Sequence, residues 1–372
     1  MSHSLLSLAV PGIRALKPYQ PGKPTEELER ELGITGSLKL ASNENPLGPS
    51  PKALAAMQGC LGELHLYPDG NGFRLKQALS QKLDVPESGL TLGNGSNDVL
   101  DLIARAYLGP GRNAVFSQYA FAVYPISTQA VGAEARIAAA NPSDHAMPYG
   151  HDLQAMLELI NDPTSVVFIA NPNNPTGTWL AADELEAFVA AVPERVLVVI
   201  DEAYIEYVRE SGFPDALRWR ERYANLIVTR TFSKIYGLAG LRVGYAVSHP
   251  EVADALNRVR QPFNVNSLAL LAAEASLDDA EHVARSVQMN VEGLVQLKAG
   301  LDKLGLSYIP TVGNFITVDL ERSAAPIYEA LLREGVIVRP IANYGLPEHL
   351  RITVAREQDN QRVLTALEKV LG

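Results

Sequence analysis

The stretch SVVFIANPNNPTG (165–177) joins a short apolar run to a loop of Asn, Pro and Gly. Two later stretches, RVLVVIDEAY (195–204) and LIVTRTFSK (226–234), have the same form. Their apolar runs end about 30 residues apart, which is the length of a unit of β-strand, helix and β-strand. Because ligands bind outside the carboxyl ends of parallel strands, the polar residues after each run are the first candidates for a site. We therefore predict a mostly parallel sheet with strands at Ser165–Ala170, Arg195–Ile200 and Leu226–Thr231.

The composition is that of a globular protein with more than one lobe. Its 372 residues exceed what one hydrophobic core usually serves, so we expect two lobes. With 47% hydrophobic and 20% charged residues, the chain is too apolar to be mostly disordered. The net charge of −10 argues against a nucleic-acid-binding protein, which would need a basic face, but it allows a local site for a small anion.

The cysteine and histidine content and the N-terminal residues limit which kinds of site and which cellular location the protein can have. Cys60 is the only cysteine, which excludes an intrachain disulfide and a cysteine-based zinc cage. The seven histidines are scattered, so we expect no metal site. The apolar patch Leu5–Val10 has no basic region before it and no cleavage pattern after it. Because no apolar run approaches the roughly 20 residues of a membrane span, we expect a cytoplasmic protein without membrane contact.

Changes of composition divide the chain into three parts. Residues 1–37 are rich in Pro, Gly and charge and are expected to form an N-terminal arm. Strand and helix signals alternate over residues 38–264, which predicts a large α/β domain. We expect residues 265–372 to form a smaller α/β domain. Its predicted elements are a helix at Leu268–Leu277 behind the caps Asn266 and Ser267, a second helix after Asp278 and Asp279, strands at Asn314–Asp319, Gly335–Arg339 and Leu350–Val354, and a closing helix.

The residues that follow the three strands together match one cofactor. The first strand leads into the amides of NPNNPTG, the second is followed by Asp201 and Tyr204, and the third leads to Lys234. Pyridoxal phosphate requires a lysine amine for its Schiff base and a carboxylate that keeps its pyridine nitrogen protonated. A phenol and an amide can hydrogen-bond the ring oxygen. These residues therefore predict a pyridoxal phosphate site.

The phosphate of such a cofactor needs its own cradle. LGNGSND (92–98) supplies small residues and opens a helix whose apolar stripe spans Val99–Tyr107. A helix N-terminus with free N–H groups binds anions, and Ser233 and Arg242 could add a hydroxyl and a guanidinium. A dinucleotide-binding fingerprint fails because Asp98 stands at its third glycine position. The sequence also contains no P-loop and no GxSxG elbow.

Taken singly, each of these features has an ordinary structural explanation. A lysine after serine is usually solvated, an aspartate after a strand is often a helix cap, and NPNNPTG contains the commonest turn residues. Gly93 and Gly95 can serve merely to permit a tight turn. What favours a functional site is their occurrence together, in one order, at the ends of predicted elements.

The order NPNNPTG (171–177), DEAY (201–204), TFSK (231–234) and GLRVGY (240–245) resembles that of fold-type-I, pyridoxal-phosphate-dependent aminotransferases. The resemblance runs from about Pro18 to the C-terminus. The chain differs from many relatives in having Ser-Asn-Asp at 96–98 where they have Ser-Asp-Glu, a change that keeps the backbone N–H groups. Four further stretches are similar to the histidinol-phosphate aminotransferase family: PYQPGKP (18–24), SNENPLGPSP (42–51), YPDGNGFRLKQAL (67–79) and LRITVA (350–355).

The resemblance implies a role for each matching position. Lys234 would be the Schiff-base lysine and the carrier of the catalytic proton, and Asp201 would pair with the pyridine nitrogen. Tyr204 and Asn174 would bond the ring hydroxyl. The other implied cofactor contacts are the backbone of Gly95, Ser96 and Asn97 and the side chains of Ser233 and Arg242 at the phosphate, Tyr124 stacked on the ring, and Tyr67 at the phosphate in a partner subunit. The implied substrate contacts are Arg351, Arg339, Tyr19 and Asn43.

The implied function is transamination of L-histidinol phosphate with 2-oxoglutarate, giving imidazole acetol phosphate and L-glutamate, by a homodimer in histidine biosynthesis. Arginine binds both phosphate and carboxylate, so one pocket could serve both substrates. Without the resemblance, Arg339 and Arg351 are better explained as surface charges on edge strands. Three alternative functions stay open: an aminotransferase of broader specificity for aromatic amino acids, a decarboxylase of a phosphorylated amino acid such as threonine phosphate, and a non-catalytic pyridoxal-phosphate-binding domain of a regulator.

Overall fold

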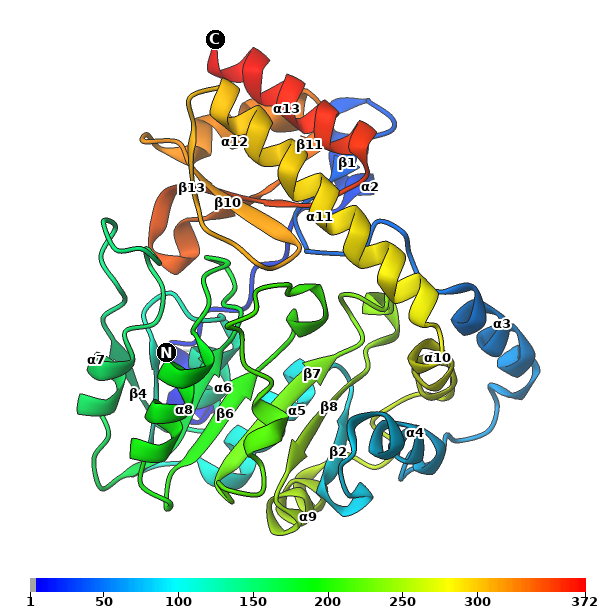
Figure 1. Ribbon diagram of the computed structural model, residues 1–372, viewed down its shortest axis with the longest axis vertical. Helices are drawn as coiled ribbons and strands as arrows, with labels where there is room; N and C mark the ends of the chain where they lie inside the picture. Colours follow the sequence, from blue (N-terminus) through cyan, green and yellow to red (C-terminus); the bar gives the residue numbers. More distant parts are fainter. Residues whose placement is uncertain (1–4) are drawn as a thin grey trace.

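The computed structural model describes residues 5–372, so the first four residues of the expected N-terminal arm lie outside the described residues. Its largest element is a seven-stranded sheet in the lower body of the molecule (Figure 1). Only β8 runs antiparallel to its neighbours, so the expected mostly parallel α/β sheet is confirmed. In spatial order the strands are β2 (Leu90–Gly93), β8 (Gly244–Ser248), β7 (Leu226–Thr231), β6 (Leu197–Asp201), β5 (Thr164–Ala170), β3 (Asn113–Ser117) and β4 (Glu134–Ala138).

The three strands predicted from apolar runs are the central strands of this sheet. β7 has the predicted bounds, β5 begins one residue earlier, and β6 begins two residues later than predicted. The difference at β6 arises because Pro193 and Val196 form a hydrogen-bonded turn that precedes the strand. Nearly every residue of the three strands is buried, because helices cover both faces of the sheet. This double coverage explains why the strands are continuously apolar rather than alternating.

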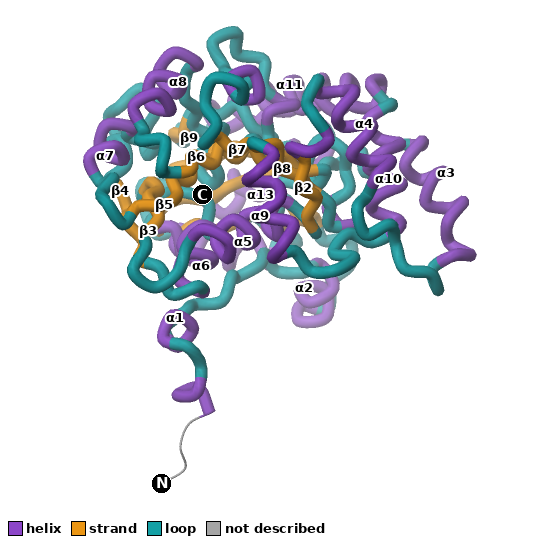
Figure 2. The backbone as a smooth tube through the Cα atoms, turned by 90° about the horizontal axis from the view of Figure 1, so that it is seen from below, coloured by secondary structure: helices purple, strands orange, loops and turns teal. Residues whose placement is uncertain are grey.

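Helices cover the sheet in two layers, which Figure 2 shows on either side of the row of strands. One hydrophobic cluster lies on each face of the sheet. The first layer holds α5 (Ser96–Tyr107), α6 (Val123–Ala130) and α9 (Pro250–Val259). The second holds α4 (Phe73–Leu83), α7 (Leu153–Glu158), α8 (Ala182–Ala191) and α10 (Ser267–Leu277), with α3 (Pro51–Cys60) packed against α10.

A second lobe stands above the first and contains the C-terminus (Figure 1). Its four-stranded antiparallel sheet packs against helices around a separate hydrophobic cluster. The long helix α11 begins at the cap Asp279, as predicted, and passes from α10 into this lobe. The sheet has the order β12 (Arg339–Ile341), β13 (Leu346–Thr353), β10 (Phe315–Asp319) and β9 (Ser307–Ile309). The helices are α11 (Ala280–Lys303), α12 (Ala324–Arg333) and α13 (Glu357–Leu371).

The two lobes are joined by strands and helices that cross the predicted domain boundaries. β1 (Leu38–Lys39), at the predicted start of the large domain, pairs in parallel with β11 (Val336–Ile337) of the second lobe. The predicted strand Gly335–Arg339 is therefore two strands, since the chain pairs first with β1 and then, from β12 onward, with β13. The helix α10, predicted as part of the small domain, packs on α3 and α4 of the first lobe.

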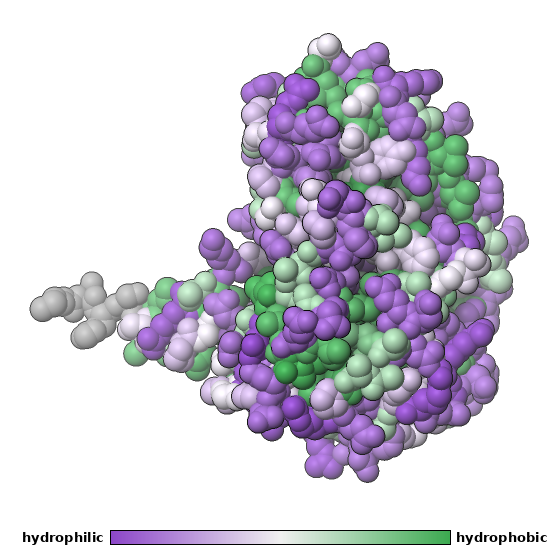
Figure 3. Space-filling view, turned by 60° about the vertical axis from the view of Figure 1, so that its left-hand side comes forward, coloured by the Kyte–Doolittle hydropathy of each residue, from purple (hydrophilic) through white to green (hydrophobic). Residues whose placement is uncertain are grey.

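The N-terminal arm carries short helices and exposed apolar side chains. α2 (Thr25–Leu32) packs Leu28 against the second lobe, whereas the segment before it stands out from the body (Figures 2 and 3). Leu5 is 82% exposed, so this segment gains little from packing within one chain. No helix within residues 5–372 has both the length and the apolarity needed to cross a membrane. The remaining short helices are η1 (Leu5–Leu8), α1 (Pro11–Arg14), η2 (Leu61–Glu63), η3 (Glu87–Gly89), η4 (Ile205–Tyr207), η5 (Ala216–Trp219), η6 (Ala239–Leu241) and η7 (Ala342–Tyr344).

Candidate active site

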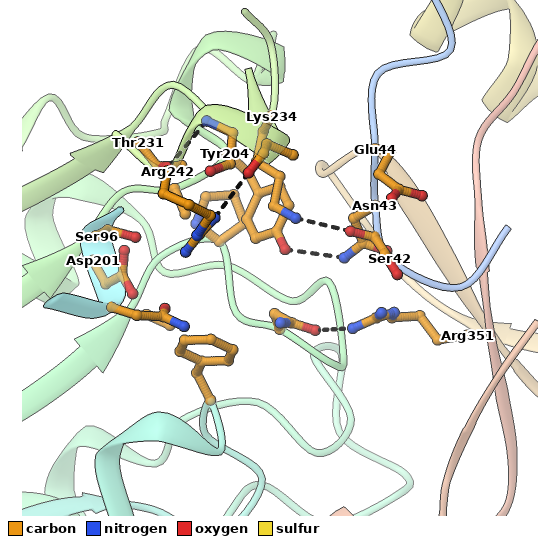
Figure 4. A pocket seen from close by; sticks show the side chains of 18 of the residues that line it. Ser42, Asn43, Glu44, Ser96, Asp201, Tyr204, Thr231, Lys234, Arg242 and Arg351 are labelled. Atoms are coloured by element: carbon orange, nitrogen blue, oxygen red, sulfur yellow. Dashed lines mark hydrogen bonds between the residues drawn. The ribbon is translucent and has the colours of Figure 1, made fainter. Parts of the chain in front are cut away.

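A pocket of about 250 Å³ opens at the carboxyl ends of β5, β6 and β7, between the two lobes (Figure 4). This is the position that a parallel sheet favours for ligands. Most residues that the sequence singled out meet here although they are far apart in the chain. The predicted residues that line the pocket are Tyr19, Asn43, Ser96, Asn97, Asn174, Asp201, Tyr204, Ser233, Lys234, Arg242 and Arg351.

Sequence reasoning missed several further lining residues. Ser42 and Glu44 flank Asn43, so the SNENP motif itself was the signal that could have found them. Phe121 follows the buried strand β3, but a single aromatic residue in a loop gives no signal by itself. The rest are small or apolar residues next to the motifs, namely Ala170, Pro172, Ala203, Thr231 and Ala239.

Lys234 lies in the loop after β7 and its amine crosses the pocket to the other wall. Nζ donates a hydrogen bond to the backbone oxygen of Ser42 at 2.9 Å and lies 5.7 Å from the ring centre of Tyr204. Burial first, and then the positive charge of Arg351, lower the pKa of Lys234 to about 7, against the opposing charge of Glu44. A lysine with such a pKa is neutral in half of the molecules near neutral pH and can act as a nucleophile or base.

We predict that Lys234 of the cofactor-free protein gains reactivity as the pH rises through about 7, rather than near the ordinary lysine value of 10.5. The sign follows because burial disfavours the ammonium form, so the reactive neutral amine accumulates at lower pH than usual. Competitive labelling with acetic anhydride, read by mass spectrometry at a series of pH values, measures this. The exposed Lys52 in the same sample is the internal reference. A Lys234 labelling curve that coincides with that of Lys52 would contradict the prediction.

Asp201 ends β6 and is one of the most buried carboxyl groups of the site. Oδ2 accepts a hydrogen bond from the Tyr124 hydroxyl at 3.1 Å. Oδ1 is buried and has no hydrogen-bond partner among residues 5–372. Burial raises the pKa of Asp201 to about 6, against the hydrogen bond from Tyr124, which lowers it. An unpaired carboxylate oxygen at a pocket wall is costly unless a ligand supplies a donor or a positive charge.

Residues from both lobes meet on the opposite wall. Asn43 Nδ2 donates to the Tyr204 hydroxyl at 3.0 Å, and Arg351 Nη1 donates to Asn174 Oδ1. Arg351 is anchored by a second bond from Nη2 to the backbone oxygen of Ala41 at 2.6 Å, which leaves Nε without a partner among the described residues. Burial raises the pKa of Tyr204 to about 12, so its hydroxyl keeps its proton. Figure 4 shows this wall facing Lys234.

The glycine-rich loop before α5 forms a small cradle beside Arg242. Gly95 has a φ of 87° and ψ of 161°, a conformation that is almost restricted to glycine. A Cβ atom at this position would overlap with the Arg242 guanidinium. Ser96 and Asn97, in the first turn of α5, line the pocket with Arg242 and Ser233. The free N–H groups of this turn and the guanidinium make an anion site.

Asp98, one of the two residues at which the chain departs from many relatives, has a structural contact. Its Oδ2 accepts hydrogen bonds from the backbone N–H of Asn94 and from Asn264 Nδ2, both at 2.8 Å. These two bonds tie the glycine-rich loop to the segment that precedes α10. A carboxylate at this position therefore stabilises the loop without touching the pocket.

We expect Gly95→Ala to weaken binding of pyridoxal 5′-phosphate about tenfold, because the new methyl group would displace the Arg242 guanidinium from the anion site. The strained backbone should also lower the free energy of unfolding by about 1–3 kcal/mol. Titration of the cofactor-free protein with cofactor and thermal unfolding check the two effects. Gly240→Ala is the matched control, because nothing lies within 4 Å of a Cβ there. Equal cofactor affinity in both variants would contradict this account of the cradle.

Besides Gly95, whose role lies in the backbone of the cradle, three predicted site residues do not line the pocket. Tyr124 is fully buried with its ring stacked on Phe168, 4.9 Å between ring centres, so it does not lie at the pocket wall as a stacking aromatic would. Because α6 begins at Val123, Tyr124 belongs to the helix and packs into the hydrophobic cluster on one face of the sheet. Phe121 precedes the helix and lines the pocket. Arg339 lies behind the wall and donates to the backbone oxygen of Gln20 at 2.5 Å. Tyr67 is 82% exposed and stacks on Phe263 away from the pocket.

This sheet, with a lysine, a buried carboxylate and an anion cradle at its carboxyl edge, has the architecture of a fold-type-I pyridoxal-phosphate-dependent enzyme. The family model for aminotransferase class I and II matches residues 35–367. The chain belongs to this aminotransferase family, and its cofactor is pyridoxal 5′-phosphate. It is therefore an enzyme that acts on small-molecule substrates.

Within this family, the chain is most usefully compared with individual relatives whose names specify a substrate. The chain is 62% identical over 374 residues to histidinol-phosphate aminotransferase 2 of Pseudomonas fluorescens Pf-5, with all of both chains covered. It is 58% identical to histidinol-phosphate aminotransferase 1 of Nitrosococcus oceani, over 100% of this chain and 99% of that one. Among solved structures, histidinol-phosphate aminotransferase from Sinorhizobium meliloti in complex with pyridoxal-5′-phosphate has a TM-score of 0.89 at 28% identity, covering 100% of this chain and 99% of the other.

Proposed function

We propose that this enzyme transfers the amino group of L-histidinol phosphate to 2-oxoglutarate, giving imidazole acetol phosphate and L-glutamate in histidine biosynthesis. The observation that carries the proposal is the 62% identity, over both full lengths, to a histidinol-phosphate aminotransferase. The pocket supports it chemically, because a buried arginine, Arg351, lies at the wall opposite the sheet. A guanidinium binds phosphate and carboxylate alike, which suits both the phosphate of the amino donor and the carboxylates of the acceptor.

The residues of the pocket fit the cofactor in three places. The neutral form of the Lys234 amine is accessible at a pKa of about 7 and can bond a carbonyl carbon. Asp201 Oδ1 lacks a partner and suits a protonated pyridine nitrogen. The cradle of Ser96, Asn97 and Arg242 suits a phosphate. When bound, pyridoxal 5′-phosphate supplies an aldehyde carbon for the amine and a ring that accepts electrons from the broken Cα–H bond.

The chain's own residues perform the remaining tasks. Lys234 Nζ would take and carry the proton released from the substrate Cα, which requires a base that is neutral near pH 7. Asp201 stabilises positive charge at the pyridine nitrogen. Tyr204 and Asn174, which line the pocket, would hold the ring hydroxyl of the cofactor, and Phe121 would take the ring-stacking role first expected for Tyr124. Arg351, held by Asn174 and Ala41, binds the anionic end of the substrate.

Residues behind the pocket wall that carries Arg351 orient the side chains that line the pocket. Arg339 lies directly opposite Arg351 in the pairing of β12 with β13, and its guanidinium carbon lies 5.9 Å from the ring centre of Tyr19. We infer that Arg339 holds Tyr19 and the arm segment over the pocket, while Asn43 orients Tyr204. In this assignment Arg339 acts on the substrate through Tyr19 and through its positive charge.

The assignment is tested by two additions to the purified enzyme loaded with cofactor. L-Histidinol phosphate alone should remove the visible absorption band of the lysine-bound cofactor, and 2-oxoglutarate added afterwards should restore it. This order of events requires that the amino group stays on the enzyme between the two half-reactions. A band that ignores histidinol phosphate but disappears with phenylalanine or tyrosine would assign the enzyme to aromatic amino acids instead.

We also propose that the active form is a homodimer and that the enzyme works in the cytoplasm. The support for the dimer is a group of exposed apolar side chains beside Tyr67, which by resemblance reaches the cofactor phosphate of the partner subunit. A chain of this kind gains stability by covering such a surface. Sedimentation equilibrium measures the oligomeric state. A cytoplasmic location suits the one free, buried thiol, Cys60. The exposed side chains are Leu54, Leu61, Leu64, Leu66, Tyr67, Phe73 and Phe263.

The proposed organisation remains an arm (1–37), a large cofactor-binding domain (38–264) and a small domain (265–372). Two separate hydrophobic clusters support the division into two lobes, whereas α10, which this division assigns to the small domain, packs in the cluster of the large one. Because the pocket lies between the lobes, substrate contacts come from both. Binding of a substrate anion by Arg351 would thus draw the small domain toward the sheet.

A further inference from the structure

Tyr124 is buried directly behind the pocket, and its hydroxyl has one partner. The hydroxyl donates to Asp201 Oδ2 at 3.1 Å, and the ring has no exposed surface. Burial and the nearby negative charge of Asp201 raise the pKa of Tyr124 well above its ordinary value. The phenol therefore keeps its proton at neutral pH and acts as a donor to the carboxylate.

The tyrosine ring itself is held by aromatic neighbours. Phe168 of β5 stacks on it with 4.9 Å between ring centres and an interplanar angle of 10°. Phe121, which lines the pocket, meets its edge at 5.9 Å and 87°. Phe116 of β3 lies at 6.3 Å. These three contacts leave the hydroxyl little freedom, so its direction toward Asp201 is set by packing.

The two oxygens of Asp201 consequently differ. Oδ2 is occupied from inside the protein by Tyr124, whereas Oδ1 is buried with no partner among residues 5–372. Asp201 lines the pocket; besides Tyr124, the Thr229 hydroxyl and the backbone N–H of Ala203 also favour its ionised form, and the other ionisable groups that act on it are Lys234 and Tyr204. Lys234 donates its hydrogen bond to Ser42, and Tyr204 accepts one from Asn43.

We propose that Tyr124 is the positioning residue of Asp201: its hydroxyl holds Oδ2 and stabilises the carboxylate, leaving Oδ1 as the oxygen that meets the pyridine nitrogen of the cofactor. The inference rests on the proposed pairing of Asp201 with that nitrogen. It gives Tyr124 a task different from ring stacking, which falls to Phe121. A hydrogen bond to a buried ionised group stabilises that form strongly, so its loss should favour the protonated acid.

Tyr124→Phe removes the hydroxyl and keeps the aromatic packing. The first measurement is the titration of the Asp201 carboxyl in the cofactor-free protein, by carbon NMR of protein labelled at the aspartate side-chain carboxyl, with Asp201→Asn assigning the signal. We expect the protonation equilibrium of Asp201 in Tyr124→Phe to shift about tenfold toward the acid, which raises its titration midpoint. This measurement needs no substrate, so its outcome is independent of the proposed reaction.

The second measurement separates positioning from binding in the loaded enzyme. Tyr124→Phe should lower kcat about tenfold and leave KM for the amino donor unchanged, because Tyr124 does not line the pocket. The matched control is Tyr207→Phe, since Tyr207 is also buried but lies outside the pocket lining. This control should leave both the Asp201 titration and kcat as in the unaltered enzyme.

A variant with the opposite expected effect distinguishes loss of the hydrogen bond from a general loss of folding or packing. Difluorotyrosine at position 124 is a stronger donor of nearly the same shape, and it should shift the Asp201 titration below that of the unaltered protein. It also keeps the test usable if Tyr124→Phe does not fold. An Asp201 titration that is the same in the unaltered, phenylalanine and difluorotyrosine proteins would overturn the inference. Shifts in opposite directions for the two variants would support it.

Discussion

Lys234→Ala should lower the rate of transamination about 10⁴-fold, the upper end of what a positioned acid–base group contributes. The reason is that Nζ is the one amine on the pocket wall, and no other lysine lines the pocket in the described part of the chain. The measurement is kcat for the amino donor with cofactor in excess. A small primary amine added to the variant should restore part of the rate, since it can move the same proton.

Two further variants test whether Lys234 contributes by transferring a proton or merely by carrying a positive charge. Lys234→Arg keeps a cation in the loop, but a guanidinium does not give up its proton, so this variant should be as slow as the alanine variant. Lys52→Ala, which removes an exposed lysine bonded to the backbone of Asp278, should retain full activity. Turnover of Lys234→Ala within tenfold of the unaltered enzyme would remove Lys234 from the proposed mechanism.

Asp201→Asn should lower kcat about 10³-fold with a smaller effect on KM, comparable to the loss of one preorganised electrostatic contact. The amide has the shape of the carboxylate but no charge to stabilise a protonated pyridine nitrogen. Because the amide of asparagine has nearly the same size as the carboxylate, the replacement fills the same buried space beside Tyr124 and the fold should be retained. The measurement is kcat and KM for the amino donor, together with the thermal unfolding temperature.

Asp215→Asn is the matched control for this prediction. Asp215 is a neighbouring carboxylate that pairs with Arg230 at 2.9 Å, in a network with Glu202, and it does not line the pocket. Its replacement should lower stability modestly and leave kcat nearly unchanged. If Asp201→Asn and Asp215→Asn reduce kcat equally, the carboxylate of Asp201 would have no special role in the reaction.

The site's central residues were predictable because sheet geometry is simple. Apolar runs of about six residues indicate buried strands, and parallel strands bring their carboxyl ends to the same edge of the sheet. Asn174, Asp201 and Lys234 each follow such a run, so the sequence was enough to expect them near one another. The cap at Asp279 was likewise predictable, since it depends on a local hydrogen bond from the backbone N–H of His282 to the Asp279 side chain.

The positions of Tyr124 and Phe121 show where sequence reasoning stops. Both are aromatic, both follow β3, and only two residues separate them. Which one reaches the pocket depends on where α6 begins and how it is rotated against the sheet, and these are consequences of packing. The same holds for the split of the predicted strand Gly335–Arg339, because its first half finds a partner in β1, about 300 residues earlier.

By itself, the sequence determined the α/β class, the strand ends that carry the polar residues and the residue types that a pyridoxal phosphate site needs, because these depend on local periodicity and on side-chain chemistry. Only the tertiary structure decided that Ser42 accepts a hydrogen bond from Lys234 and that Arg351 meets Asn174. It also decided that one oxygen of Asp201 is occupied by Tyr124 and the other is not. Such contacts join segments from 77 to 192 residues apart, and their geometry follows from how whole lobes pack, which no local pattern encodes.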